Sequence, residues 1–317
     1  MSGAMIQTIV GALLPVVVTL LLGFVAGWRH DFDGKQATTL NRMVMLYALP
    51  LALFAGMAGI PRNEVLAQRE LALALFIGMI GFYALVVLVS YGFLKRNLSL
   101  ASLRALAIAG PAVPFVGPAV LGNLFGASSV MPISIASLLM NLIQVPVTLM
   151  ALSGATRSQA TSNVPKPSLG GQIVKALREP VVWAPLAALA LVLLNIQFPE
   201  VIRNALMLLG GSTGGVALFA SGIVLFSRRV VFNRAVAVSV LARNIVIPAA
   251  MMALVRLLGW PADVSREAVL TLAIPTSSIP VILAVQYQTA EQEMASTLFF
   301  STVFSVLTMG GFIWLTA

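Results

Sequence analysis

The chain of 317 residues has no cysteine, a single histidine and few charged side chains. Without cysteine it can form no disulfide, thiol nucleophile or thiolate metal site. With one histidine it cannot build the histidine pair of a zinc protease helix. Charged residues make up 9% of the chain, against roughly 25% in an ordinary soluble domain. These absences exclude most thiol and metal chemistry, and we expect no metal and no cofactor.

Apolar residues take the place of the missing charges: they make up 59% of the chain, and mean hydropathy is +1.00. A soluble fold could not cover that much apolar surface with polar groups. The sequence therefore predicts an all-α polytopic membrane protein, in which each spanning helix takes about 20 residues. Ten apolar runs qualify as spans: Ile6–Trp28, Leu40–Gly59, Glu70–Leu94, Ser102–Leu124, Met131–Leu152, Val181–Ile196, Val201–Phe226, Ala235–Leu258, Ala268–Tyr287 and Met294–Thr316.

The formal net charge of the chain is +9, and the distribution of its Lys and Arg residues between the loops predicts the membrane topology. With ten spans, 13 cations fall on one side of the membrane and 5 on the other, and Arg243 is left over. The positive-inside rule places the richer side in the cytoplasm, so both termini lie outside. We therefore expect no nucleic acid partner. The richer side comprises Arg29, Lys35, Arg42, Lys95, Arg96, Arg104, Arg157, Lys166, Lys175, Arg178, Arg228, Arg229 and Arg234; the poorer side comprises Arg62, Arg69, Arg203, Arg256 and Arg266.

The two halves of the chain resemble each other. The motif Leu51–Gly56 in the second span recurs as Val216–Gly222 in the seventh, and Pro111 in the fourth span lies 164 residues before Pro275 in the ninth. Two such halves with five spans each have opposite orientations in the membrane, which is typical of secondary transporters. We therefore divide the chain into a first repeat (residues 1–152), a cytoplasmic linker (residues 153–172) and a second repeat (residues 173–317).

Prolines interrupt the fourth and ninth predicted spans: Pro111, Pro114 and Pro118 in the fourth, and Pro275 and Pro280 in the ninth. A proline inside a helix frees the carbonyl four residues before it, which predicts free carbonyls at Ala107, Gly110, Pro114, Thr271 and Thr276. Irregular backbone at membrane depth is tolerated where it lines a cavity, so these breaks indicate a substrate site. Opened helix N-termini favour an anion, and the hydroxyls of Thr276, Ser277 and Ser278 can bind a polar ligand. The alternative is that the prolines are ordinary packing kinks.

Arg243 is the one ionisable residue predicted to lie deep in a span. It follows Arg234 by nine residues, which places it roughly 13 Å into the helix. No acidic residue lies deep enough to pair with it, so it either caps the free carbonyls of a broken helix or binds an anionic substrate. Asn244 and Asn141 are polar neighbours at similar depth, and helix packing is the alternative role for Asn141. Without deep carboxylates, facilitated diffusion or exchange is favoured over a dedicated ion-coupling site.

Several segments in order along the chain are similar to the auxin efflux carrier family, and to its bacterial branch. Residues Asn41–Phe54 resemble the family's second-span signature, in which Tyr47 lies, and Glu179–Pro185 resembles the start of the family's second half. The ninth span resembles the family's proline-containing crossover. Arg243 lies five residues before Pro248, where the family commonly has Lys or Arg before a proline. The resemblance covers nearly the whole chain.

The resemblance implies that spans 4 and 9 cross at their prolines, with Pro114 and either Pro275 or Pro280 at the crossing, and that Asn141 occupies a polar site position. It implies a scaffold of spans 1, 2, 6 and 7, which also forms a homodimer surface. Spans 3–5 and 8–10 would form a transport domain with elevator-type alternating access. It implies the bacterial inner membrane as the location, and organic anions as substrates, malonate or related small carboxylates among them. The residues Thr276–Ser278 and the short linker depart from the plant proteins, so an indole pocket does not follow.

Together, these observations predict a secondary transporter for malonate or a similar dicarboxylate, not an enzyme. An aromatic (auxin-like) acid exporter and a sodium-coupled organic-anion symporter are the alternatives, and a membrane enzyme and a non-transporting receptor are further ones. The expected partners are the small organic anion, the lipid bilayer and a second copy of the chain. The candidate substrate-binding residues are Tyr47, Gly110, Pro111, Val113, Pro114, Asn141, Arg243, Asn244, Pro275, Thr276, Ser277, Ser278 and Pro280.

Overall fold

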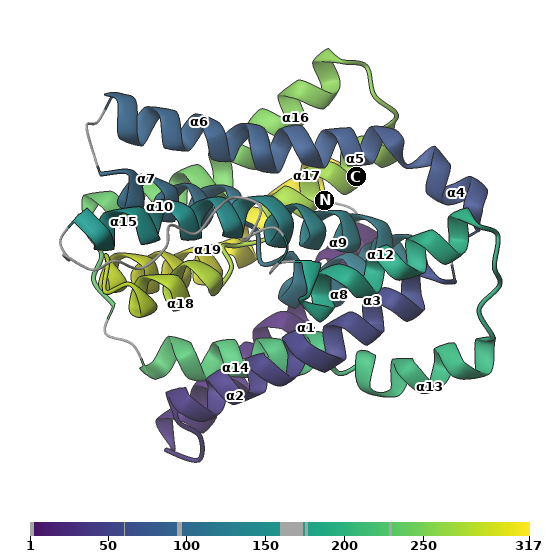
Figure 1. Cartoon of the computed structure of the whole chain (residues 1–317), viewed down its shortest axis with the longest axis horizontal. Helices are drawn as coiled ribbons and strands as arrows, with labels where there is room; N and C mark the ends of the chain where they lie inside the picture. Colours follow the sequence, from purple (N-terminus) through teal and green to yellow (C-terminus); the bar gives the residue numbers. More distant parts are fainter. Residues whose placement is uncertain (1–2, 60, 94–96, 159–173, 175–176, 228–229) are drawn as a thin grey trace.

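The computed structural model describes residues 3–59, 61–93, 97–158, 174, 177–227 and 230–317, and over these residues it is helical (Figure 1). The one extended pairing among them is an isolated bridge between Pro111 and Thr276. The predicted linker lies outside the described residues from 159 onward. The predicted cytoplasmic cations Lys95, Arg96, Lys166, Lys175, Arg228 and Arg229 also lie outside them.

The first half of the chain forms helices that are repeatedly interrupted by single π-helical turns (η1, η2, η3 and η5). In order they are α1 (Gly3–Trp28), α2 (Gly34–Met43), η1 (Val44–Ala48), α3 (Leu49–Met57), α4 (Arg62–Ala67), α5 (Arg69–Phe76), η2 (Ile77–Gly81), α6 (Phe82–Leu88), η3 (Val89–Phe93), α7 (Leu98–Ala109), α8 (Val113–Phe125), the 3₁₀ turn η4 (Gly126–Ser129), α9 (Val130–Leu139), η5 (Met140–Gln144) and α10 (Val145–Ser158).

The described second half is also helical, with one π-helical turn. It contains α12 (Pro180–Leu193), α13 (Glu200–Gly210), α14 (Thr213–Ser227), α15 (Arg234–Leu241), the π-helical turn η6 (Ala242–Val246), α16 (Ile247–Leu257), α17 (Ala262–Ala273), α18 (Ile279–Gln286) and α19 (Glu291–Leu315). Three π-helical turns, η1, η5 and η6, are each followed by a helix whose second residue is a proline: Pro50, Pro146 and Pro248. Because proline has no N–H to donate, the wider π turn lets the helix continue past it.

Six helical stretches in the described part of the chain are long and apolar enough to cross a membrane: Gly34–Met57, Arg69–Gly92, Val113–Leu152, Glu200–Phe226, Arg234–Leu257 and Glu291–Leu315. Shorter apolar helices cover Val17–Trp28, Leu98–Ala109 and Pro180–Leu193. The prediction of an all-helical, multi-span membrane protein is confirmed. The arrangement as ten spans in two inverted repeats stays a prediction.

The break predicted between a span ending at Leu124 and one beginning at Met131 is present, although it contains no long loop. The 3₁₀ turn η4 forms it, and Gly126 reverses the chain with φ of +60°. The stretch Val113–Leu152 is therefore two helices that pack against each other, since a Cβ atom added at Gly117 of α8 would lie 3.1 Å from the side chain of Ile133 of α9. The hydroxyls of Ser128 and Ser129 donate to the carbonyls of Phe125 and Gly126, which satisfies two backbone groups at the bend.

The helices pack as two groups. In one, α1 packs along α14, α2 packs on α14, and α3 packs on α12 and α13. In the other, α7 packs on α6 and α10, α17 packs on α5, α16 and α19, and α15 packs on α19. In Figure 1 the helices α1, α2, α13 and α14 lie in the lower part of the view, and α6, α7 and α16–α19 lie above them.

Small residues allow α1 and α14 to approach closely. A Cβ atom added at Gly23 of α1 would collide with the backbone carbonyl oxygen of Phe219, and one added at Gly222 of α14 would collide with that of Leu20. The two backbones are therefore in direct contact, which is how helices associate in membranes where apolar burial gives little driving force. Helix α14, which this contact joins to α1, also contributes Val224 to the wall of the cavity described below.

Candidate substrate site at the helix crossover

Two broken helices meet near the centre of the molecule. The chain leaves helical geometry between α7 and α8, and again between α17 and α18. At the crossing, the backbone N–H of Ala112 donates to the carbonyl of Pro275 (2.8 Å), and the N–H of Ser277 donates to the carbonyl of Gly110 (3.2 Å). These bonds satisfy backbone groups that the breaks would otherwise leave unpaired away from water.

The crossover has an internal symmetry. A shift of 165 residues carries Gly110 to Pro275 and Ala112 to Ser277, so it exchanges the two hydrogen bonds with each other. The same shift carries Pro111 to Thr276, the two residues of the bridge, and carries η2 onto η6. Segments in the two halves of the chain thus have the same local structure and pair with each other antiparallel.

Arg243 caps the ends of both broken helices. Its side chain is fully buried, and its guanidinium donates from Nε to the carbonyl of Ile274 (3.0 Å), from Nη1 to that of Ile108 (3.0 Å) and from Nη2 to that of Leu272 (2.6 Å). Nη2 also donates to Ile274. These carbonyls belong to the last turn of α7 and to the last turn of α17 and the residue that follows it. Of the two predicted roles of Arg243, the structure shows carbonyl capping, since the planar fork matches three acceptors on two helices. The carbonyls are not those predicted from proline spacing alone.

Gln144 has a similar role in the first half, and sequence reasoning missed it. It is fully buried in η5, and its Nε2 donates to the carbonyls of Met79 and Ala109, both at 3.0 Å. Met79 lies in the π turn η2, where its carbonyl also accepts from the backbone N–H of Phe82, and Ala109 ends α7. An amide in an apolar run just before Pro146 is the signal that could have identified it.

Asn244 is linked by hydrogen bonds to the break between α17 and α18 through Ser301 of α19. Its Nδ2 donates to the carbonyl of Ser301 (2.8 Å), and its Oδ1 accepts from the Ser301 hydroxyl (2.7 Å). The same hydroxyl oxygen accepts from the backbone N–H of Thr276 (3.1 Å). Asn244 therefore positions the backbone at Thr276 through the side chain of Ser301. Ser301 was not among the predicted residues.

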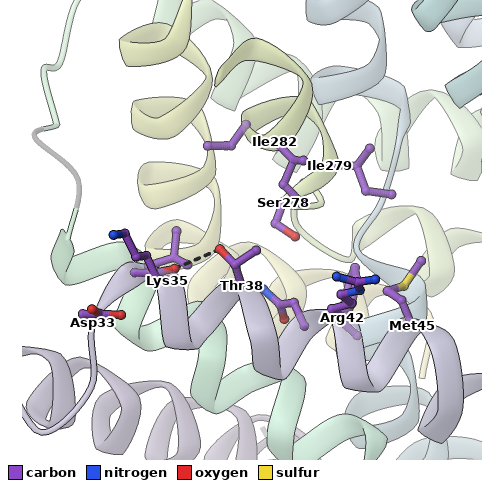
Figure 2. A pocket seen from close by; sticks show the side chains of 13 residues that line it. Asp33, Lys35, Thr38, Arg42, Met45, Ser278, Ile279 and Ile282 are labelled. Carbon is purple, nitrogen blue, oxygen red and sulfur yellow. Dashed lines mark hydrogen bonds between the residues drawn. The ribbon is translucent and has the colours of Figure 1, made fainter. Parts of the chain in front are cut away.

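A cavity of about 800 Å³ lies between α2 and the start of α18 (Figure 2). Figure 2 shows Lys35, Thr38 and Arg42 of α2 and Met45 of the following turn η1 along one helical face, with Ser278, Ile279 and Ile282 facing them across the space. The remaining lining residues are Asp33, Gly34, Asn41, Phe115, Val224 and Val281. The cavity therefore lies between α2 of the first packing group and α18, which packs on α7 and α19 of the second, while α8 packs on α1 and α14 as well as on α9.

The α2 wall is positively charged. It carries Lys35 and Arg42, while the carboxylate of Asp33 caps its own helix by accepting from the backbone N–H of Gln36 (2.8 Å). Asn41 lines the same wall with a buried Oδ1 that has no hydrogen-bond partner among the described residues. The opposite wall is the N-terminus of α18, which carries partial positive charge. Both walls therefore favour an anion.

A second, much smaller cavity of about 20 Å³ lies at the crossover itself. Ala112, Pro275 and Thr276 line it, and Phe115 and Ser278 line both cavities. A water molecule needs a space of roughly 10–15 Å³ on a comparable measure. The crossover therefore has space for little more than one water, whereas the larger cavity next to it has space for an organic anion.

Comparison with known proteins identifies the family. The sequence matches the family described as "Membrane transport protein" over residues 8–313. The chain belongs to this family. The match confirms the predicted resemblance to the auxin efflux carriers. As a member of the membrane transport protein family, the chain is a transporter and not an enzyme.

Two bacterial relatives match this membrane transport protein over nearly its whole length. It is 29% identical over 310 residues to "Uncharacterized transporter YfdV" of Escherichia coli (strain K12), covering 96% of each chain. It is 23% identical over 312 residues to "Putative malonate transporter" of Rhizobium meliloti (strain 1021), covering 97% of this chain and 95% of the relative. Because both matches cover at least 95% of each chain, the similarity extends over nearly all of the helices and is not limited to one motif.

The structure brings most of the predicted residues of this membrane transport protein together at the crossover. Gly110, Pro111, Pro275, Thr276 and Ser277 form or flank the bridge. Val113 and Pro114 begin α8, Ser278 precedes α18 and Pro280 is its second residue, and Arg243 and Asn244 hydrogen-bond around the crossover. The hydroxyls of Thr276 and Ser277 are buried and have no hydrogen-bond partner among the described residues. Ser278 is the predicted residue that lines the large cavity.

Two predicted residues lie elsewhere. Tyr47 is 60% exposed in η1 and does not line either cavity. Asn141 donates to the carbonyl of Ser137 (2.8 Å) in its own helix and also lies outside both cavities. The residues that sequence reasoning missed are Lys35, Thr38, Asn41 and Arg42. It counted Lys35 and Arg42 toward the topology, took Asn41 and Arg42 as part of a family signature, and did not consider Thr38. Their spacing of three and four residues places them on one helix face, which is the signal that was available.

Proposed function

We propose that this membrane transport protein is a secondary transporter for small organic carboxylates, malonate or a similar dicarboxylate first. The observation that supports this most strongly is the cavity between α2 and α18, where Lys35 and Arg42 face Ser278. A cavity of about 800 Å³ is within the range of ligand sites. Cations on one wall and a helix N-terminus on the other give an anion two attachment points.

The choice of a dicarboxylate follows from these two walls. One carboxylate can pair with Arg42, whose fork binds two oxygens at once, while the other accepts hydrogen bonds at Ser278 and the start of α18. The name of the Rhizobium meliloti relative supports malonate as the first substrate to test. An aromatic acid is the second candidate, because Phe115, Ile279 and Ile282 give the cavity a large apolar surface.

We further propose that the chain has ten spans in two inverted repeats of five. The exchange of the two crossover hydrogen bonds by one 165-residue shift supports an internal two-fold relation, as does the correspondence of η2 with η6. In this arrangement the loops rich in Lys and Arg are cytoplasmic, both termini lie outside, and the membrane is the bacterial inner membrane. The large cavity then opens from the cytoplasmic side, where α2 begins.

We propose elevator-type alternating access as the mechanism. The cavity lies between α2 of one packing group and α18 of the other, so the group with α18, together with α8, can slide along the surface of α1, α2 and α14 that it contacts. A substrate bound at Ser278 would move with α18 and leave Arg42 behind. The family resemblance supports a homodimer through α1, α2, α3, α12, α13 and α14, which would hold the stationary group in place.

Ligand binding tests the proposal directly. The purified protein is heated with a panel of mono- and dicarboxylates, and we expect malonate and its close analogues to raise the melting temperature. The variant Arg42→Gln should weaken malonate binding about tenfold, because a charge-assisted hydrogen bond contributes about 1.5–3 kcal/mol. Arg29→Gln is the matched control, since Arg29 is exposed and outside the cavity. Stabilisation by aromatic acids alone would support the second candidate, and a lack of response to every anion would refute the proposal.

A further inference from the structure

A third cavity, which shares no lining residue with the crossover, carries two arginines without acidic partners. It has a volume of about 390 Å³ and lies where the turn between α16 and α17 meets the end of α19. Arg256, Trp260, Ser265, Arg266 and Thr316 supply its polar side chains, Ala317 also lines it, and Met252, Val255, Val269 and Leu315 supply much of its apolar surface. This site shares no residue with the cavity at α2 and α18.

The turn that builds this cavity is defined by its sequence. The N–H of Trp260 donates to the carbonyl of Val255 (3.1 Å) and that of Gly259 donates to Arg256 (3.3 Å), the two bonds of a Schellman motif. Gly259 has φ of +64°, which glycine adopts without strain. The motif ends α16 directly after Arg256 and turns the chain into α17, so that Arg256 and Arg266 line one space.

The charge of Arg266 is left without a partner. No carboxylate lies within 4.0 Å of either guanidinium among the described residues, where the ion pairs found join Arg29 to Asp31 and Arg104 to Glu293. The Nε of Arg266 is buried and has no hydrogen-bond partner there. One face of its guanidinium lies over the ring of Phe125, with Cζ 5.8 Å from the ring centre. A buried donor without an acceptor is unfavourable, and an oxyanion in the cavity would satisfy it.

The nearby acidic residues do not neutralise this pair. Glu267 accepts from the hydroxyl of Ser128 in the turn η4 (3.3 Å), and neither it nor Asp263 lines the cavity. The two arginines therefore form a positive site against an apolar wall. Arginine and tryptophan at the ends of apolar helices are also typical of the membrane–water interface.

We propose that this cavity binds the phosphate group of an anionic phospholipid from the adjacent leaflet. Arg256 and Arg266 bind the phosphate oxygens, Trp260 lies at the headgroup level, and the apolar wall contacts the first part of the acyl chains. The pair of charges explains the preference for an anionic over a zwitterionic lipid, and the apolar wall explains why a lipid fits better than a soluble phosphate. This lipid site is independent of the proposed substrate site.

Lipid binding by the full chain in detergent tests the proposal. The thermal stability and the native mass spectrum are measured during titration with phosphatidylglycerol, and in parallel with phosphatidylcholine, glycerol phosphate and malonate. We expect saturable binding of phosphatidylglycerol that is tighter than that of phosphatidylcholine. Arg256→Gln and Arg266→Gln should each weaken it about fivefold, because one basic residue near an anionic lipid surface contributes about that factor.

Matched variants keep the result interpretable. Arg69→Gln removes an exposed arginine that does not line the cavity and should leave lipid binding unchanged. Arg266→Lys retains the charge and should restore most of the affinity, which excludes misfolding as the cause of the loss. Equal binding of the two phospholipids, or an equal loss in Arg69→Gln, would overturn the proposal. Binding of glycerol phosphate as tight as that of phosphatidylglycerol would also overturn it, because the site would then select a soluble phosphate.

Discussion

The substitution Arg243→Met tests whether Arg243 acts as a cap or as a substrate ligand. Methionine is long and apolar, so it fills much of the space but donates no hydrogen bond. The change leaves the carbonyls of Ile108, Leu272 and Ile274 without their side-chain donor in a fully buried site. Each unsatisfied buried group costs about 1–3 kcal/mol, which gives roughly 3–9 kcal/mol for three.

Part of this cost is recovered, because the variant no longer buries a charge, and burial of an ion costs several kcal/mol. The net loss is therefore near the lower end, about 3 kcal/mol. For a chain of this size about 2 °C accompanies each kcal/mol, so we expect the melting temperature to fall by roughly 6 °C. Uptake of the substrate into proteoliposomes should be lost together with this stability, since the two broken helices lose their common cap.

Two further variants complete this test. Arg243→Lys keeps the charge but has no planar fork, so we expect partial recovery of both stability and uptake. Asn141→Ala is the control, because Asn141 donates only within its own helix, to Ser137, and should change the stability by less than about 1 kcal/mol. A wild-type melting temperature in Arg243→Met, with uptake abolished, would show that Arg243 binds substrate and would refute the capping role.

Three more outcomes follow from the structure. Gln144→Leu should lower thermal stability by about 1–3 kcal/mol, because it leaves the carbonyl of Ala109 without its side-chain donor and removes one of two donors from that of Met79; unchanged stability in thermal unfolding would contradict that role. Gly222→Leu should prevent correct folding, measured as loss of the monodisperse peak in size-exclusion chromatography, because its side chain would collide with the backbone of α1. Imposed sodium and proton gradients should have little specific effect on uptake in proteoliposomes, and a strict sodium requirement would show that a coupling site has been missed.

Much of the fold could be predicted because the bilayer restricts the available structures. Apolar runs had to be helices, since each backbone group must find its partner inside the segment. The prolines at positions 111 and 275 correctly marked the two breaks, because the loss of an N–H donor is a local effect. The break expected after Leu124 is present, because Gly126 adopts a φ of +60° there and Ser128 and Ser129 bond the backbone at the bend.

The site was harder to predict, because it depends on which segments meet. Arg243 was correctly singled out by its depth, yet its depth could not decide between a cap and a ligand. That choice depends on the carbonyls of Ile108 and Ile274, which only the crossing of two distant helices brings to one guanidinium. Lys35 and Arg42 were treated as topology markers because charge counts carry no information about the wall that faces them.

Counterflow in proteoliposomes tests the central claim most directly. Vesicles that contain the wild-type protein and are loaded with unlabelled malonate are placed in a trace of labelled malonate, with Arg42→Gln vesicles alongside. A malonate transporter accumulates the label transiently and faster than protein-free vesicles do, and the variant accumulates it about tenfold more slowly if one charge-assisted bond is lost. Labelled malonate at the level of protein-free vesicles, with other mono- and dicarboxylates equally inactive, would contradict the account.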